Sequence, residues 1–127
     1  MTVIWHNPSC STSRRVLQML RDGGETPEVI DYRRTPPDRE TIRRWIADAG
    51  LTVRQALRRR NTPYDDLGLD DPELTDDQLL DSVLAHPILL ERPFVRTALG
   101  TRLCRPPERV CEIMVNPPSA RDGVPPS

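Results

Sequence analysis

Apolar residues open the chain as a short continuous run and then recur three or four positions apart. The run ends in a polar, proline-containing turn, which is typical of a buried strand that arrives at a loop. The helical spacing that follows ends at Gly23-Gly24, a pair that favours a helix C-terminus. A second apolar run comes next, and a helix that crosses over between two such strands predicts that they are parallel. The opening is therefore a β-α-β unit, with a strand over residues 2–5, a helix over residues 12–23 and a strand over residues 28–32.

Helical spacing dominates the middle of the chain. Prolines and an aspartate at residues 35–38 break the preceding strand and favour the start of a helix that ends at Gly50. A further short helix is expected over about residues 52–60. Thr75 and Gln78 have the spacing of a capping box, so another helix should begin at Thr75 and stop before Pro87.

Shorter apolar segments return near the C-terminus. They predict a strand over residues 93–95, a turn at Leu99-Gly100, a strand over residues 101–104 and a short helix from Pro106 through Ile113. The proline-rich residues 116–127 are expected to form a disordered tail. The order β-α-β, helical block, β-β-α matches an α/β fold, the thioredoxin/glutaredoxin-like sandwich. We expect a single domain over residues 1–115 with an all-helical insertion at about residues 36–86, and fold analogy predicts a cis peptide bond at Arg92-Pro93.

The loop after the first strand carries the most informative residue of the chain, Cys10. It lies at or just before the start of the first helix, where free backbone N–H groups and the helix dipole favour an anion. Such a position can lower the pKa of a thiol from about 8.5 to below neutrality, especially with His6 and Arg14 nearby. We therefore interpret Cys10 as a reactive thiolate. The plainer alternatives are an inert buried thiol at Cys10 and a purely structural, loop-capping role for His6.

Composition excludes several classes of protein. At 127 residues the chain lacks an apolar run long enough for a membrane span and lacks the features of a signal peptide, so a cytoplasmic protein is expected. The three scattered cysteines fit no disulfide framework and no zinc site, and we expect no metal.

The charged residues are unevenly distributed. The chain has 18 arginines and no lysine, and residues 61–91 have nine acidic residues and no arginine. A small-anion pocket would therefore use arginines from both sides of that segment. A net charge of −1 gives little support to nucleic-acid binding.

Several segments together resemble the glutaredoxin-coupled arsenate reductases of the ArsC type. The resemblance spans residues 2–114, and it is the combination of segments that is specific. The matching segments are His6-Asn7-Pro8-Ser9-Cys10-Ser11-Thr12-Ser13-Arg14, Val53-Arg54-Gln55-Ala56-Leu57-Arg58, Thr75-Asp76-Asp77-Gln78-Leu79, His86-Pro87-Ile88-Leu89, Glu91-Arg92-Pro93 and Gly100-Thr101-Arg102-Leu103-Cys104-Arg105-Pro106.

The resemblance implies an activity and a set of site residues. The cysteine of the first motif, Cys10, would attack arsenate, and His6 would assist its thiolate. Three arginines would hold the oxyanion, and by position these are Arg58, Arg92 and Arg105. Glutathione as co-substrate and glutaredoxin as partner would complete the reduction to arsenite, with no bound cofactor. A monomer is expected.

Alternatives remain open at this stage. Without the resemblance, Arg59 or Arg60 would serve as well as Arg58, and strand alternation alone does not choose between Arg102 and Arg105. Cys104 and Cys111 could be buried residues or resolving thiols of an intramolecular relay. The phosphatase-like reductases that use such a relay have a C-x5-R loop, whose arginine position is occupied here by Val16. The second hypothesis is a regulator of the Spx type, which binds RNA polymerase through a redox switch. That switch resembles a CxxC pair, and here Ser13 stands in place of the second cysteine. A same-fold reductase of another substrate is the third hypothesis.

Overall fold

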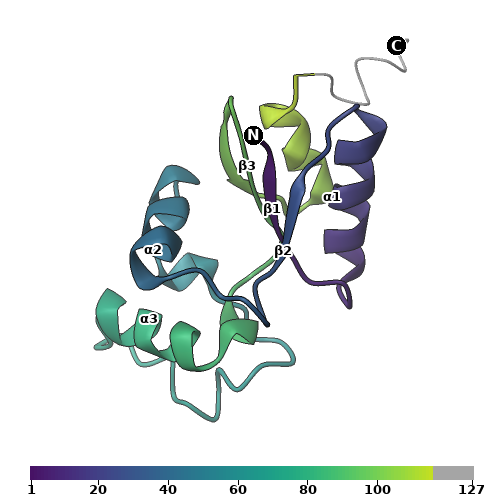
Figure 1. Cartoon of the computed structure of the whole chain (residues 1–127). Helices are drawn as coiled ribbons and strands as arrows, with labels where there is room; N and C mark the ends of the chain where they lie inside the picture. The colour runs from purple at the N-terminus through teal and green to yellow at the C-terminus, as the bar shows by residue number, and fades with distance from the viewer. Residues whose placement is uncertain (116–127) are drawn as a thin grey trace. The chain divides into compact units, whose positions relative to one another are not determined.

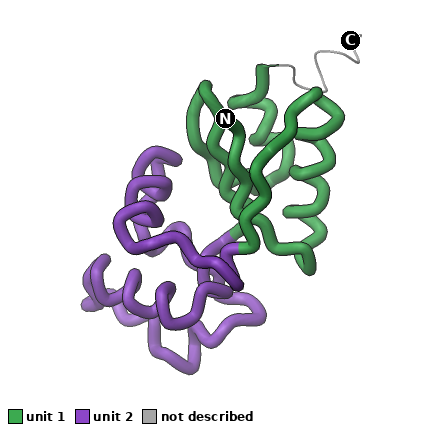
Figure 2. Tube along the Cα trace, in the orientation of Figure 1, with its two compact units in different colours: residues 1–31, 92–127 green, residues 32–91 purple. Residues whose placement is uncertain are grey.

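The computed structural model describes residues 1–115, and the expected disordered tail over residues 116–127 lies outside them. The chain divides into two compact units (Figure 2). Among the described residues, unit 1 combines Met1–Asp31 with residues 92–115, and unit 2 is the intervening Tyr32–Glu91. The expected helical insertion at residues 36–86 falls inside unit 2.

Unit 1 contains one four-stranded sheet with the strand order β2-β1-β3-β4 (Figure 1). β1 pairs in parallel with β2 and antiparallel with β3, and β3 pairs antiparallel with β4. This mixed sheet with its helices is the α/β arrangement expected for the thioredoxin/glutaredoxin-like sandwich. The strands are β1 (Val3–His6), β2 (Glu28–Asp31), β3 (Phe94–Thr97) and β4 (Gly100–Leu103).

One face of the sheet is covered by the helix α1 (Ser11–Asp22) and the 3-10 helix η3 (Pro107–Ile113). Alternation along β1 sends Ile4 and His6 to this face, while Trp5 points to the opposite face, where its ring meets that of Phe94 at 5.7 Å. The aliphatic core between the sheet and these helices consists of Ile4, Val16, Leu17, Met19, Leu20, Val95, Cys104, Val110, Ile113 and Met114.

The helix α1 ends at the glycine pair Gly23-Gly24. Gly23 follows α1 as its C-cap, and Gly24 takes a φ of +86°, a conformation that favours glycine.

The peptide bond Arg92-Pro93 is cis, as fold analogy predicted, and Arg105-Pro106 is cis as well. Both bonds precede or follow strands at the same edge of the sheet, because the start of β3 pairs with the end of β4.

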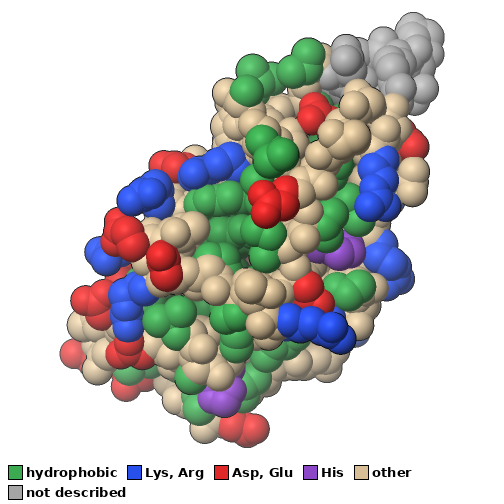
Figure 3. All heavy atoms as spheres, viewed as in Figure 1, with side chains coloured by type: hydrophobic (Ala, Val, Ile, Leu, Met, Phe, Trp, Pro, Cys, Tyr) green, Lys and Arg blue, Asp and Glu red, His purple; other side chains and the backbone are tan. Residues whose placement is uncertain are grey.

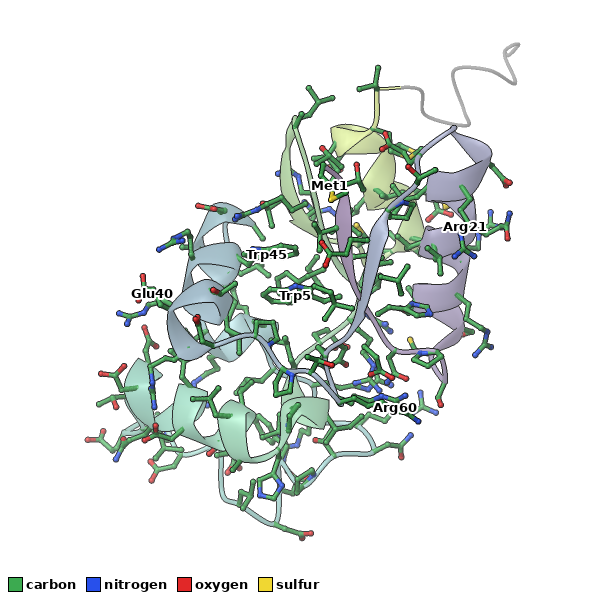
Figure 4. All side chains as sticks on the ribbon, in the orientation of Figure 1. Met1, Trp5, Arg21, Glu40, Trp45 and Arg60 are labelled. Atoms are coloured by element: carbon green, nitrogen blue, oxygen red, sulfur yellow. The ribbon has the colours of Figure 1, made fainter. Side chains whose placement is uncertain are left out.

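Unit 2 is helical. Its elements are α2 (Arg39–Asp48), the 3-10 helix η1 (Arg54–Ala56), α3 (Asp76–Ala85) and the 3-10 helix η2 (Pro87–Leu89). Asp38 caps α2 by accepting from the Thr41 amide at 2.8 Å. Trp45 and Glu40 project from opposite sides of α2 (Figure 4); the Trp45 side chain is buried and that of Glu40 is exposed. This division is the amphipathic pattern expected for a helix on the surface of a small core.

Ion pairs neutralise much of the acidic segment of unit 2. Arg39 of α2 pairs with Asp77 and Asp81 of α3, and Arg59 pairs with Asp65. On the face drawn in Figure 3, basic and acidic side chains are interspersed over this unit. The uneven distribution of charge along the sequence therefore does not produce a uniformly acidic surface on this face.

The expected helix over residues 52–60 is reduced to η1. The backbone of Leu57 is extended and forms an antiparallel bridge with Leu90, and the Arg58 amide donates to the Leu89 carbonyl at 2.7 Å. These contacts between segments distant in sequence outweigh the helical spacing of the local apolar residues. As a result, Leu57 and Arg58 lie beside Leu89 and Leu90 and do not continue a helix.

No helix within residues 1–115 combines the length and the apolar character that crossing a bilayer requires.

The capping box of α3 provides a test of the local fold. The Thr75 hydroxyl accepts from the Gln78 amide at 3.2 Å, and the Gln78 side chain accepts from the Thr75 amide at 2.8 Å. Thr75→Ala should lower the free energy of unfolding by about 1 kcal/mol, because it leaves an N-terminal amide of the helix without its partner. Thr75→Ser, which keeps the hydroxyl, is the matched control and should change the urea midpoint little. Equal midpoints for the alanine variant and the unsubstituted protein would contradict this account.

Candidate active site around Cys10

Cys10 is the N-cap residue of α1. Its backbone is extended, with φ −97° and ψ 121°, and its side chain makes no capping hydrogen bond of its own. The Cys10 amide donates to the Asn7 carbonyl at 2.9 Å, and the Cys10 carbonyl accepts from the Arg14 amide at 3.0 Å. The cysteine is thus fixed between the end of β1 and the first turn of α1, with its partly buried sulfur facing the free amides of that turn.

The surroundings of the sulfur favour the thiolate. Partial burial raises the pKa of the Cys10 thiol, but hydrogen bonds from the backbone amides of Ser13 and Thr12 and from the Arg105 side chain lower it, as does the charge of Arg92. The lowering influences prevail, so the pKa of Cys10 lies below its ordinary value. The same amides and guanidinium groups would also attract an oxyanion.

Two of the three predicted arginines lie in unit 1 beside this sulfur. Nη1 of Arg105 lies 3.9 Å from the Cys10 sulfur and also donates to the Arg92 carbonyl at 3.0 Å. The Arg92 side chain is buried, and its charge acts on the thiol of Cys10. Arg102, which sequence reasoning left as an alternative to Arg105, instead pairs with Glu112 at 3.0 Å. The structure therefore brings Arg92 and Arg105, and not Arg102, to the cysteine.

His6 is linked to the cysteine loop through Ser13. His6 Nδ1 and the Ser13 hydroxyl oxygen are 2.6 Å apart, and both side chains are buried. This contact was not predicted from the sequence, in which Ser13 is a residue of the first motif that stands in place of the second cysteine of a CxxC pair. One signal was available: Ser13 is a polar residue at a position of the apolar stripe that Val16, Leu17 and Leu20 continue along α1.

Arg58, the third predicted arginine, belongs to unit 2. Its Nη1 pairs with Glu91 at 3.1 Å and its Nε donates to the Arg60 carbonyl at 3.1 Å. Arg59 is held differently, by Asp65 and over the ring of Tyr64. Arg58 is consequently an ordered, partly buried side chain within its unit, whereas the side chain of Arg59 is largely exposed.

The remaining cysteines lack the features of Cys10. None of the three cysteines, all within residues 1–115, forms a disulfide; Cys104 is fully buried in the core of unit 1, and burial raises its pKa to about 12. Cys111 packs against the same core. Within residues 1–115, no group of three or more His, Cys, Asp or Glu side chains has the arrangement of a metal site.

Comparisons with known proteins agree with the resemblance noted in the sequence. The model of the ArsC family matches residues 5–113. The chain is 52% identical over 128 residues to an arsenate reductase of Rhizobium meliloti strain 1021, a match that covers 97% of this chain and 91% of the relative. It is 51% identical over 120 residues to an arsenate reductase of Escherichia coli strain K12, with 94% of this chain and 83% of the relative covered.

A solved structure agrees as well. The arsenate reductase from Vibrio cholerae superposes with a TM-score of 0.84 at 42% sequence identity, and the match covers 89% of this chain and 97% of that one. The region that the family model matches includes the cysteine loop, both arginines beside it and all of unit 2. On this evidence the chain belongs to the ArsC family.

Proposed function

We propose that this protein is an arsenate reductase in which the Cys10 thiolate attacks arsenate and glutathione and glutaredoxin supply the electrons. The observation that carries the proposal is the placement of Cys10: a thiol of lowered pKa at the start of α1, with the Arg105 guanidinium 3.9 Å from its sulfur. Membership of the ArsC family and about 50% identity to arsenate reductases support the same reaction.

The reaction brings two anions together, and this explains the arginines. Arsenate near neutral pH is a doubly charged tetrahedral oxyanion, so an attacking thiolate meets like-charge repulsion. Guanidinium groups neutralise the oxygens bidentately and remain charged at every relevant pH. We assign this role to Arg92 and Arg105 beside the sulfur and to Arg58 of unit 2. The same charges would stabilise the oxygen that leaves as the As–O bond breaks.

The first step forms a bond without a change of oxidation state. The Cys10 sulfur attacks arsenic, an S–As bond forms, and one As–O bond breaks with the oxygen leaving as water after it gains protons. We assign to His6 the role of assisting the thiolate in this step. The product is a Cys10-S-arsenate adduct in which arsenic is still As(V).

The second step moves two electrons. The thiolate of glutathione attacks the adduct, a disulfide forms between Cys10 and glutathione, and the electron pair of the S–As bond stays on arsenic, which leaves as arsenite. A glutaredoxin thiolate then attacks the mixed disulfide and releases the Cys10 thiolate. We therefore expect a cytoplasmic reaction, since these thiols are kept reduced there. We further propose that the reaction needs neither Cys104 nor Cys111 and that the protein acts as a monomer.

Loss of the nucleophile gives the first test of the function. Cys10→Ser should reduce arsenite formation by about 1,000-fold or more in an assay with arsenate, glutathione, glutaredoxin and a system that regenerates reduced glutathione. Cys104→Ala and Cys111→Ala should keep most of the activity. Full turnover by the Cys10 variant would overturn the mechanism, and no turnover by the unsubstituted protein would overturn the function.

Alkylation tests the electrostatics of the thiol directly. The rate of reaction of Cys10 with iodoacetamide should rise with pH through a midpoint below that of an ordinary thiol, because the charged form prevails earlier. Arg105→Gln removes a group that lowers this pKa, so the midpoint should move to higher pH. Arg102→Gln removes an arginine that pairs with Glu112 instead and should leave the midpoint unchanged. Mass spectrometry of the modified peptide identifies the residue; an unmoved midpoint in the Arg105 variant would contradict the account.

A third test separates the adjacent arginines of unit 2. Arg58→Gln should lower kcat/KM for arsenate by about 10- to 100-fold, as loss of a charge-assisted contact to an oxyanion predicts. Arg60→Gln is the matched control, because Arg60 is exposed (its position is labelled in Figure 4) and meets Arg58 through its backbone carbonyl. Urea unfolding of both variants checks that the loss of the Arg58–Glu91 pair has not unfolded unit 2. Equal kcat/KM values for the two variants would remove Arg58 from the substrate site.

A further inference from the structure

The hydroxyl of Ser13 occupies a place where α1 otherwise buries carbon. Ser13 is fully buried and begins the stripe that Val16, Leu17 and Leu20 continue against the sheet. A buried hydroxyl is costly unless it is hydrogen-bonded, so its partners show what it does. Both partners come from the end of β1 and the residue after it: His6 Nδ1 at 2.6 Å and the Asn7 amide nitrogen at 3.1 Å.

The position of each hydrogen follows from these two contacts. A backbone N–H can only donate, so the Asn7 amide donates to the Ser13 oxygen. The Ser13 hydroxyl then has one hydrogen left to donate. Among residues 1–115 the acceptor that this hydrogen meets is His6 Nδ1. If Nδ1 instead carried a hydrogen, two donors would point at the serine oxygen and the buried serine hydrogen would lose its acceptor.

We propose that Ser13 is a positioning residue of the Cys10 site, which donates to His6 Nδ1 and so holds the imidazole in the neutral tautomer that is protonated at Nε2. The hydroxyl links β1 to the first turn of α1, the two elements between which Cys10 is fixed. It therefore holds the orientation of the ring and leaves the ring hydrogen on Nε2.

For the proposed function, on which this part of the inference rests, the consequence is a division of roles. The guanidinium of Arg105 and the amides of the first helical turn supply the positive field at the sulfur. His6 in the Nε2–H form contributes a directed N–H, which can donate a hydrogen bond, and not a full charge. Ser13 acts through His6 and does not itself meet the substrate.

The tautomer can be read directly by NMR. The chain has two histidines, and His86 is exposed, so His86→Gln assigns the ring signals of His6 in a two-bond ¹H–¹⁵N correlation spectrum at neutral pH. We expect the His6 ring nitrogens to show the Nε2–H pattern, with Nδ1 as the unprotonated nitrogen. Ser13→Ala should shift the ring toward a mixture of tautomers, and Ser13→Thr, which keeps a hydroxyl, should restore the original pattern. Ser11→Ala, at an exposed position of the same helical turn, is the matched control and should not change it.

Activity of the same variants completes the test. Ser13→Ala should lower kcat/KM for arsenate by about 10-fold, as loss of a residue that orients a catalytic group does, while Ser11→Ala and Ser13→Thr should stay within about 2-fold. An Nδ1–H or doubly protonated His6 in the unsubstituted protein would overturn the proposal even if Ser13→Ala did not fold. Full activity of Ser13→Ala with an altered tautomer would overturn the positioning role. An Nε2–H ring in a protein without arsenate turnover would support the Ser13–His6 contact and reject the proposed function instead.

Discussion

The structure around Cys10 depends on one electrostatic constraint: a sulfur anion at the start of a helix has to be matched by positive groups. The first backbone amides of any helix lack acceptors within the helix, so those of α1 provide part of this positive field. Each amide carries only a partial charge. The Arg105 guanidinium, 3.9 Å from the sulfur, adds a full charge. Burial works in the opposite direction, and the pKa of Cys10 is lowered because the donors and charges prevail over it.

The topology of the sheet brings Arg92 and Arg105 to the sulfur of Cys10. β3 runs antiparallel to β1, so the start of β3 lies beside the end of β1, where the cysteine loop begins. β4 runs antiparallel to β3, so the end of β4 returns to the same edge. Arg92 precedes β3 and Arg105 follows β4, and the amide of Cys104 donates to the Pro93 carbonyl at 2.9 Å to join these segments. Arginines separated by the length of a strand pair thus meet without any local sequence signal.

Much of the fold could be predicted from the sequence because its signals are local. The capping box at Thr75 and the N-cap at Asp38 each begin a helix where the spacing of apolar residues predicted one. The helix expected over residues 52–60 is shorter in the structure, a 3-10 helix over Arg54–Ala56, for the opposite reason. Leu57 pairs with Leu90, a residue far along the chain, and no window of sequence around Leu57 contains that partner.

For the site, the sequence by itself pointed to the proposed nucleophile: a strand, a polar turn and a helix start place Cys10 where a thiolate is favoured. The resemblance to a family then selected Arg58, Arg92 and Arg105, a choice that periodicity alone did not make. Only the tertiary structure decided that Arg105 and not Arg102 turns to the sulfur, because Glu112 of η3 holds Arg102. It also revealed the bond between Ser13 and His6. Chain order fixes which groups a helix or strand can carry, but packing between distant segments decides which of them meet.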